Sequence, residues 1–199
     1  MNPATTILAG GLLVGGSSCV GKTTACRVLA ARHGFAHVET DRTLPADAGL
    51  RPLDGSDSVW DHDAQELCQR LVRAAEAGMP YIESQARELS IAMGPWVLEG
   101  ERVHPALARR LTDARVARGV FVVELDGARI FRTLIERLPG FKTLSVQQQA
   151  TVAEVDRLYN EWLVEESRHY DIACIESQPW HSLAERLLDQ RRYPVALPN

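Results

Sequence analysis

The stretch Gly-Ser-Ser-Cys-Val-Gly-Lys-Thr-Thr, residues 16–24, decides the fold that this chain is expected to adopt. It fits the phosphate-binding pattern Gly-x4-Gly-Lys-[Ser/Thr], in which backbone N–H groups and a helix N-terminus converge on an anion. An apolar segment, Leu12–Val14, precedes the stretch, and a helix-like segment follows it as far as His33. The order strand, loop, helix therefore predicts a phosphate-binding site. A flexible Gly/Ser-rich turn is the alternative.

The loop pattern also predicts a role for individual side chains. Lys22 is expected to reach the β- and γ-phosphates of a nucleoside triphosphate, and the Thr23 hydroxyl is expected to ligate the accompanying Mg²⁺. The residues predicted to hold the nucleotide are Gly16, Ser17, Ser18, Cys19, Val20, Gly21, Lys22, Thr23 and Thr24.

Cys19 stands where many phosphate loops have a third glycine. A cysteine at this place predicts a backbone conformation that ordinary residues adopt, since glycine is favoured where φ is positive. The thiol would lie near the positive end of a helix, which can lower its pKa and make it reactive. A small, inert loop residue is the alternative.

Length and composition limit the classes of protein to consider. The 199 residues, of which 45% are apolar, predict one soluble globular domain that spans 1–199. The formal net charge of −4 argues against a general nucleic-acid binder, which usually has a basic face. The cysteines lack paired spacing and the chain has no run of about 18 apolar residues, so we expect a reduced cytoplasmic setting and no membrane span.

Strand-like and helix-like segments alternate along the rest of the chain. Apolar segments predict further strands at 35–41, 95–100, 119–125 and 171–175. Periodicity and composition predict helices at 60–78, 81–93, 104–114, 146–170 and 182–191. Because a strand–helix–strand unit implies a right-handed crossover and a parallel sheet, we predict a three-layer α/β fold with helices on both faces.

Two acidic residues end predicted strands and are expected beside the phosphate loop. Asp41 ends the second strand, and ligands of parallel sheets collect at the carboxyl ends of the strands, so Asp41 is expected in the active-site crevice. Glu99 lies at the end of the third strand, where a carboxylate can hold Mg²⁺ or orient the substrate. A strand-end residue that bonds a nearby amide or arginine is the alternative for Glu99.

Two segments are expected to cover the site. Residues 42–93 predict a helical insertion that holds the phosphate acceptor, with an ordinary packing layer as the alternative. Arg129, Arg132 and Arg137 recur on a helical stretch that breaks at a Pro-Gly pair. This pattern predicts a lid at 127–146 that closes over the phosphates and excludes water. A surface helix with solvated arginines is the alternative.

The C-terminal part carries three smaller predictions. Arg157 is expected either to point into the site or to pair with Glu154 or Glu161 on the same helix. Ser177–Pro179, after the fifth strand, is predicted to border the nucleotide base. The tryptophans are expected to serve the core rather than an interface; those considered are Trp60, Trp96 and Trp180.

Taken together, the alternating strands, the phosphate loop, the acid after the second strand and the arginines after the fourth resemble the P-loop small-molecule kinases. Residues 15–24 look like the loops of 2-phosphoglycerate kinase-like and chloramphenicol phosphotransferase-like proteins. Thr40-Asp41 is similar to the shikimate and gluconate kinase pattern, in which the matching acid contacts the acceptor hydroxyl. The Asp-Gly-x-Pro-Arg stretch of adenylate kinase-like enzymes is absent, since Glu-Gly-Glu-Arg-Val-His-Pro stands at 99–105. The resemblance implies a three-layer P-loop NTPase fold with a five-stranded sheet of order 2-3-1-4-5.

These observations predict an ATP- and Mg²⁺-dependent kinase that transfers a phosphoryl group to a hydroxyl of a small metabolite or nucleoside-like acceptor. The predicted catalytic residues are Lys22, Asp41, Arg132 and Arg137; the substrate residues are Asp41 and Glu99; and the metal ligands are Thr23 and Glu99. A regulatory NTPase that acts through a protein partner is the alternative, and a nucleotide-binding protein that has lost catalysis is a third reading. The sequence lacks the Asn-Lys-x-Asp guanine motif, and no pattern in it identifies the acceptor or the oligomeric state.

Overall fold

Five parallel strands form the centre of the protein. The computed structural model describes residues 10–43, 62–92 and 94–192. Its sheet has the order β2-β3-β1-β4-β5, which confirms the topology expected from the sequence. The strands are β1 (Gly11–Gly16), β2 (Ala36–Glu39), β3 (Trp96–Gly100), β4 (Ala117–Val123) and β5 (Ala173–Glu176).

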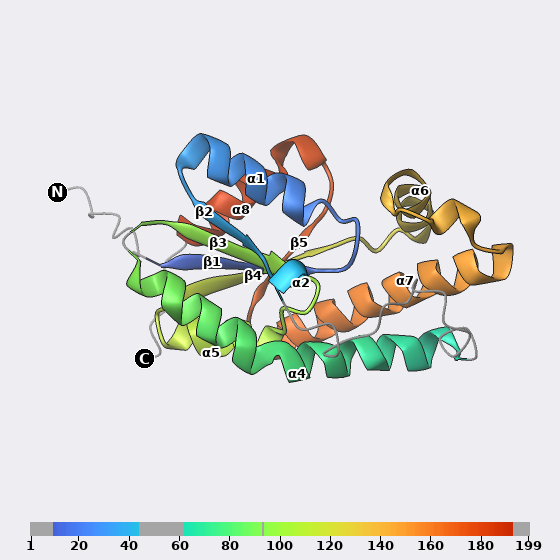
Figure 1. Cartoon of the computed structure of the whole chain (residues 1–199), viewed down its shortest axis with the longest axis horizontal. Coiled ribbons are helices and arrows are strands. Elements are labelled where there is room, and N and C mark those ends of the chain that lie inside the picture. The colour runs from blue at the N-terminus through green and yellow to red at the C-terminus, as the bar shows by residue number, and fades with distance from the viewer. Residues whose placement is uncertain (1–9, 44–61, 93, 193–199) are drawn as a thin grey trace.

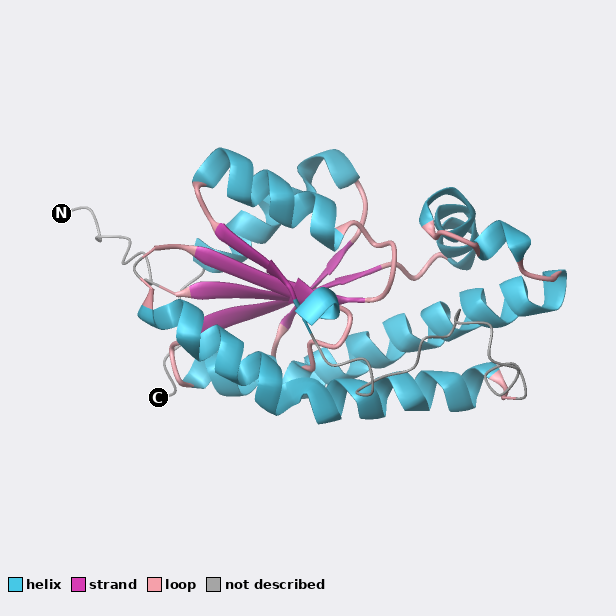
Figure 2. Ribbon diagram, viewed as in Figure 1, coloured by secondary structure: helices cyan, strands magenta, loops and turns pink. Residues whose placement is uncertain are grey.

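Helices cover both faces of this sheet and make three layers (Figures 1 and 2). On one face lie α1 (Lys22–His33) and α8 (Leu183–Arg192). On the other face lie α4 (Ala64–Ile91), α5 (Pro105–Asp113) and α7 (Val146–His169). The remaining short elements are α2 (Thr40–Thr43), α6 (Gly127–Arg137), η2 (Phe141–Thr143) and η3 (Trp180–Ser182).

Alternation along the strands divides the apolar core between the two faces. In β1, Leu12 and Val14 pack against the α1 and α8 layer, whereas Leu13 packs against the α4, α5 and α7 layer. This is the period of two that a strand covered on both faces requires. Trp96 is 2% exposed and belongs to the second layer, which confirms its expected place in the core.

The segment expected to form two helices forms one. α4 continues through both Gly78 and Pro80, so the predicted end at Gly78 is wrong. A proline inside a helix costs about 3 kcal/mol because it removes a backbone hydrogen bond. The buried side of α4, which includes Gly78, Ile82 and Ala86, packs on the sheet layer and beside α7, and this burial outweighs the local cost (Figure 1).

Other element boundaries differ from the predicted ones by a few residues. β2 ends at Glu39, and Asp41 lies in the short helix α2 rather than on the strand. The predicted irregular loop at 42–59 and Trp60 lie mostly outside the described residues. In the described parts of the chain, no helix combines the length and the apolar character needed to cross a membrane.

The predicted lid helix packs against both the phosphate loop and α7. Ile130 and Leu134 of α6 form a small apolar cluster with Phe141 of η2. Cys19 of the loop packs against this cluster, as does Val152 of α7. α6 therefore shares an apolar contact with the phosphate loop instead of lying free on the surface.

Candidate functional site

The phosphate loop joins the end of β1 to the start of α1. Gly16 has φ 148° and Gly21, the N-cap of α1, has φ 95°, and both values favour glycine. A Cβ atom at Gly16 would lie 2.3 Å from the Val122 carbonyl oxygen, so a side chain does not fit there. The loop thus presents its backbone at the positive end of the α1 dipole, where an anion is favoured.

Lys22 places a positive charge inside this loop. Its side chain is buried, and Nζ donates hydrogen bonds to the carbonyl oxygens of Gly16 (2.9 Å) and Ser17 (2.6 Å). Thr23, in the first turn of α1, is half-buried. The residues present therefore fit a bound triphosphate, with a buried cation, a cradle that excludes side chains and a hydroxyl at the helix N-terminus.

Cys19 departs from its predicted conformation. It has φ 60°, so the expectation of an ordinary backbone conformation is wrong; the loop needs a positive φ here although glycine is absent. Burial, followed by the negative charge of Asp156, raises the pKa of the Cys19 thiol to about 11. The thiol is therefore protonated near neutral pH, and the inert reading of this residue is the one that the structure favours.

Helix α7 holds the phosphate loop from the other side. Asn160 is fully buried; its Nδ2 donates to Ser17 Oγ (2.8 Å), and its Oδ1 accepts from the Glu124 N–H (3.0 Å). One turn earlier, the buried carboxylate of Asp156 accepts a hydrogen bond from the backbone N–H of Ser18. Two side chains of α7 thus contact consecutive serines of the loop.

Asp41 lies at the carboxyl edge of the sheet, as expected, and is tied to the segment that follows β3. Both of its carboxylate oxygens accept from the Glu101 N–H at 3.1 Å. The Ser18 hydroxyl donates to Glu101 Oε1 (2.9 Å), and the Tyr159 hydroxyl donates to the Glu101 carbonyl oxygen (2.7 Å). A Cβ atom at Gly100 would lie 1.8 Å from Thr40 Oγ1, so glycine permits this close approach.

Two carboxylates, Glu101 and Asp156, therefore contact Ser18, and a third, Asp41, lies beside Glu101. Burial, and then the charge of Asp41, raises the pKa of Glu101. Burial, and then the charge of Glu101, raises the pKa of Asp156 well above its ordinary value. The Lys22 ammonium opposes both increases, so it is the counter-charge of this edge.

Glu99 is turned away from this edge. Its side chain is 2% exposed and faces the α1 layer, where its carboxylate lies 3.5 Å from His37 Nε2. The residue that follows the strand and reaches Ser18 is Glu101. The metal and substrate roles of Glu99 stay predictions.

The predicted lid arginines lie beside Trp180, at the other end of the phosphate loop. The Arg137 guanidinium stacks over the Trp180 ring at 4.4 Å from the ring centre. Arg132 lines a groove with Thr133 and Trp180, while Arg129 pairs with Glu124 (3.3 Å). Their closure over phosphates stays a prediction.

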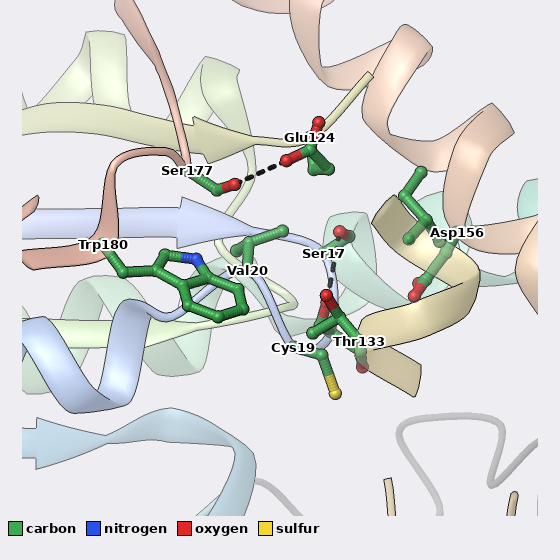
Figure 3. Close-up of a pocket in the computed structure, with 10 residues that line it drawn as sticks. Ser17, Cys19, Val20, Glu124, Thr133, Asp156, Ser177 and Trp180 are labelled. Atoms are coloured by element: carbon green, nitrogen blue, oxygen red, sulfur yellow. Dashed lines mark hydrogen bonds between the residues drawn. The ribbon is translucent and has the colours of Figure 1, made fainter. Parts of the chain in front are cut away.

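A pocket runs along the loop between α6, α7 and the end of β5. Figure 3 shows Trp180 at one end of it and Asp156 at the other, with Ser17, Cys19 and Val20 between them. Ser177, from the predicted base-side segment, lines it and donates to Glu124 Oε2 (2.8 Å). The pocket brings together the loop, the lid helix and the base-side segment.

Four residues of the site were missed from the sequence: Glu101, Asp156, Tyr159 and Asn160. A signal existed for two of the three on α7, because Asp156 and Asn160 are polar residues four apart beside an apolar stripe, which puts them on one buried helix face. Glu101 gave no signal beyond its place after the third strand. Arg157 pairs with Glu154 (2.7 Å) and with Glu161, so the ion-pair alternative is the correct one.

Several solved structures of small-molecule kinases have a fold similar to that of this chain. The gluconokinase of Sinorhizobium meliloti 1021 matches with a TM-score of 0.54 at 13% identity, over 92% of this chain and 92% of that one. The shikimate kinase of Bacteroides thetaiotaomicron matches with a TM-score of 0.55 at 13% identity, over 90% and 97%. The shikimate kinase of Acinetobacter baumannii, solved in complex with shikimate, gives 0.53 at 13% identity, over 93% and 95%.

At this level of identity the likeness establishes the fold. The protein has the P-loop small-molecule kinase fold, as the resemblance of its loop and strand order predicted. No family model and no curated protein matches the chain.

Proposed function

We propose that this protein is an ATP-dependent phosphotransferase that phosphorylates a hydroxyl group of a small molecule. The observation that carries the proposal is the contact between Asp41 and the phosphate loop through Glu101. The Glu101 N–H binds the Asp41 carboxylate and its side chain accepts from Ser18. A candidate base thus lies one residue away from the loop that would hold the phosphates.

The phosphate half of the site supplies binding and charge. The loop N–H groups and Lys22 would hold the β- and γ-phosphates, and Lys22 would donate to the oxygens on which charge develops during transfer. ATP would supply the phosphoryl group, and Mg²⁺ would neutralise its negative charge. Thr23 would be the protein's ligand to the metal.

Asp41 would act on the acceptor. Its carboxylate is exposed at the sheet edge and is oriented by the Glu101 N–H, so it can accept or orient the hydroxyl proton of the acceptor. The acceptor oxygen would attack the γ-phosphorus of ATP while its proton moves to a carboxylate oxygen of Asp41. The bond between the γ-phosphorus and the β–γ bridging oxygen would break, and ADP would leave.

Trp180 and Arg137 would bind the base at the far end of the pocket. Their stacked arrangement provides a flat aromatic surface and a cation beside Cys19, whose pKa responds to the Arg137 charge. Arg132, on the same helix, would reach the phosphates if α6 closes. Residues 42–93 would supply the acceptor pocket, as predicted.

The test is ATP consumption by the purified full chain with Mg²⁺, alone and against a panel of acceptors. The panel contains sugar acids, neutral and amino-substituted polyols, nucleosides and hydroxylated antibiotics. Lys22→Met keeps the length and apolar stem of the side chain but removes its charge, and it should lower turnover at least about 10³-fold. Arg27→Met, on the exposed side of the same helix, is the matched control.

The outcomes separate the candidate functions. Consumption that requires one acceptor class, yields a phosphorylated product and is lost in Lys22→Met supports the proposal. Equal hydrolysis with and without every acceptor would instead identify an NTPase switch. The absence of any turnover, with nucleotide still bound, would identify a binding protein that has lost catalysis.

A further inference from the structure

A second cluster of potential ligands lies between the sheet and α1, outside the phosphate loop. It contains His37 and Glu39 from β2 and Glu99 from β3. Glu39 pairs with Glu99 in the sheet register, and His37 is two residues before Glu39 on the same face of β2. One ligand atom from each residue lies within 4.8 Å of the others. Imidazole and carboxylate groups together suit a divalent ion such as Zn²⁺ or Co²⁺.

The two innermost members of this cluster are the carboxylate of Glu99 and the ring of His37. Glu99 is 2% exposed, and its carboxylate lies 3.5 Å from His37 Nε2. His37 Nε2 is itself buried and has no hydrogen-bond partner among the described residues. A buried carboxylate is costly unless a positive charge or hydrogen-bond donors are close to it, so this pair favours a cation or a protonated imidazole.

The separation of the two groups favours a cation between them. His37 Nε2 and Glu99 Oε1 are 3.5 Å apart, which is longer than an ordinary charge-assisted hydrogen bond. Two ligands of a tetrahedral zinc ion, each about 2.0–2.1 Å from the metal, are roughly 3.4 Å apart. The observed distance thus fits a pair of metal ligands better than a direct imidazolium–carboxylate bond.

Glu39 provides the third ligand and the connection to solvent. Its carboxylate is 18% exposed and pairs with Arg27 and Arg42, each at 2.7 Å. A carboxylate offers about four lone-pair positions, so the two arginines leave positions at which Glu39 can also bind a cation.

We propose that His37, Glu39 and Glu99 form a site for one divalent transition-metal ion, separate from the Mg²⁺ that accompanies the nucleotide. Three protein ligands leave one position for water. The ion would join β2 to β3 at the sheet edge and stabilise the strand that precedes Asp41. Cys26 of α1 faces Glu99, whose charge adds to burial in raising the pKa of this thiol, and Cys26 is outside the ligand set.

The test is a Co²⁺ titration of the chelator-treated, nucleotide-free full chain, followed by visible absorption, with Zn²⁺ competition. We expect one equivalent of Co²⁺, a four-coordinate d–d spectrum without a thiolate charge-transfer band, and displacement by Zn²⁺. Zn²⁺ at 100 times its Kd should raise Tm by roughly 5–10 °C.

Variants assign the ligands. His37→Gln and Glu99→Gln should each weaken Co²⁺ binding at least 100-fold. His62→Gln is the matched control, because His62 forms a comparable pair with Glu66 (2.8 Å) on the surface of α4. The His62→Gln protein should bind Co²⁺ as tightly as the wild type does. Lys22→Met should also bind Co²⁺ normally, so a failure of the phosphotransfer proposal would leave this result intact.

A measurement on the wild-type chain keeps the proposal testable if a variant does not fold. The ¹⁵N shifts of the His37 ring distinguish a metal-bound neutral imidazole from an imidazolium paired with Glu99. Metal-dependent shifts support the site. An imidazolium with no saturable Co²⁺ or Zn²⁺ binding, a thiolate band, or binding unchanged in both variants would overturn it.

Discussion

The phosphate half and the acceptor half of the candidate site are assembled in different ways. The phosphate half is a single run of nine consecutive residues, 16–24, from the end of β1 into the first turn of α1. The acceptor half combines Asp41, Glu101 and Asp156, which come from three elements and meet only in the folded chain. The first half depends on local backbone geometry, whereas the second depends on how α7 and the end of β3 dock against the loop.

If the two halves act separately, a substitution in the acceptor half should lower kcat without changing the binding of ATP. Asp41→Asn should lower kcat about 10²- to 10⁴-fold, because an amide cannot accept the acceptor proton. The KM for ATP should change little, since the loop is untouched, and the amide oxygen can still accept the Glu101 N–H. Steady-state kinetics with the acceptor found in the panel measure both values.

Asp113→Asn is the control for this substitution. Asp113 is an exposed carboxylate at the C-terminal end of α5, where it pairs with Arg109 (3.0 Å). Its variant should keep the wild-type kcat. A kcat within threefold of wild type for Asp41→Asn would show that Asp41 is not the base.

Asn160 tests how strongly α7 holds the phosphate loop. Asn160→Ala should lower the free energy of unfolding by about 2–3 kcal/mol, because it leaves the Ser17 hydroxyl and the Glu124 N–H without buried partners. Urea denaturation measures this loss. Thr151→Ala, on the same helix, removes a hydroxyl that bonds only the Gln147 carbonyl oxygen and should change stability by less than about 0.5 kcal/mol. Equal effects of the two variants would contradict the linking role of Asn160.

Asp156, one turn before Asn160 on α7, is expected to make the stability of the protein depend on pH. Burial, and then Glu101, raises its pKa well above 3.8, so the folded protein holds this proton more tightly than the unfolded chain. Stability is therefore lost as pH rises from about 4 through the folded pKa. Asp156→Asn should remove this loss and exceed wild type by on the order of 1 kcal/mol at neutral pH, a common size for one substitution. The difference should vanish near pH 4.

Asp126→Asn should change the pH dependence with the opposite sign. Asp126 caps α6, and the Arg129 N–H lowers its pKa, so its contribution is present above the ordinary pKa and is lost as pH falls. Its variant should be less stable than wild type at neutral pH. Thermal or urea unfolding across pH compares the two variants. An Asp156→Asn protein that is less stable than wild type at neutral pH would refute the assignment.

The smallest effect is expected at Arg157, which points away from both halves. It pairs with Glu154 and Glu161 on the exposed side of α7, and such surface pairs contribute about 0–1 kcal/mol. Arg157→Ala should therefore change stability by less than about 0.5 kcal/mol and leave kcat unchanged. A tenfold loss of kcat would contradict this prediction and would show that Arg157 acts in the site.

Much of the fold was predictable because its signals are local. The apolar runs located all five strands, and the phosphate loop located the first crossover. The break predicted at Gly78 failed because propensity describes an isolated helix, whereas α4 is stabilised by packing on its buried side. The conformation of Cys19 was mispredicted for a related reason, since the surrounding loop imposes a positive φ on a residue that does not favour it.

For the site, residues 16–24 and the strand pattern were enough to predict the phosphate half and the position of Asp41 at the sheet edge. Those predictions follow from contiguous residues and from the rule that parallel strands place their carboxyl ends at one edge. The packing of the layers was needed to find that Glu101 rather than Glu99 reaches Ser18, and that Asp156 and Asn160 contact the loop. The reason is physical: strand alternation turns Glu99 toward α1, and side chains from distant elements meet only when the layers pack.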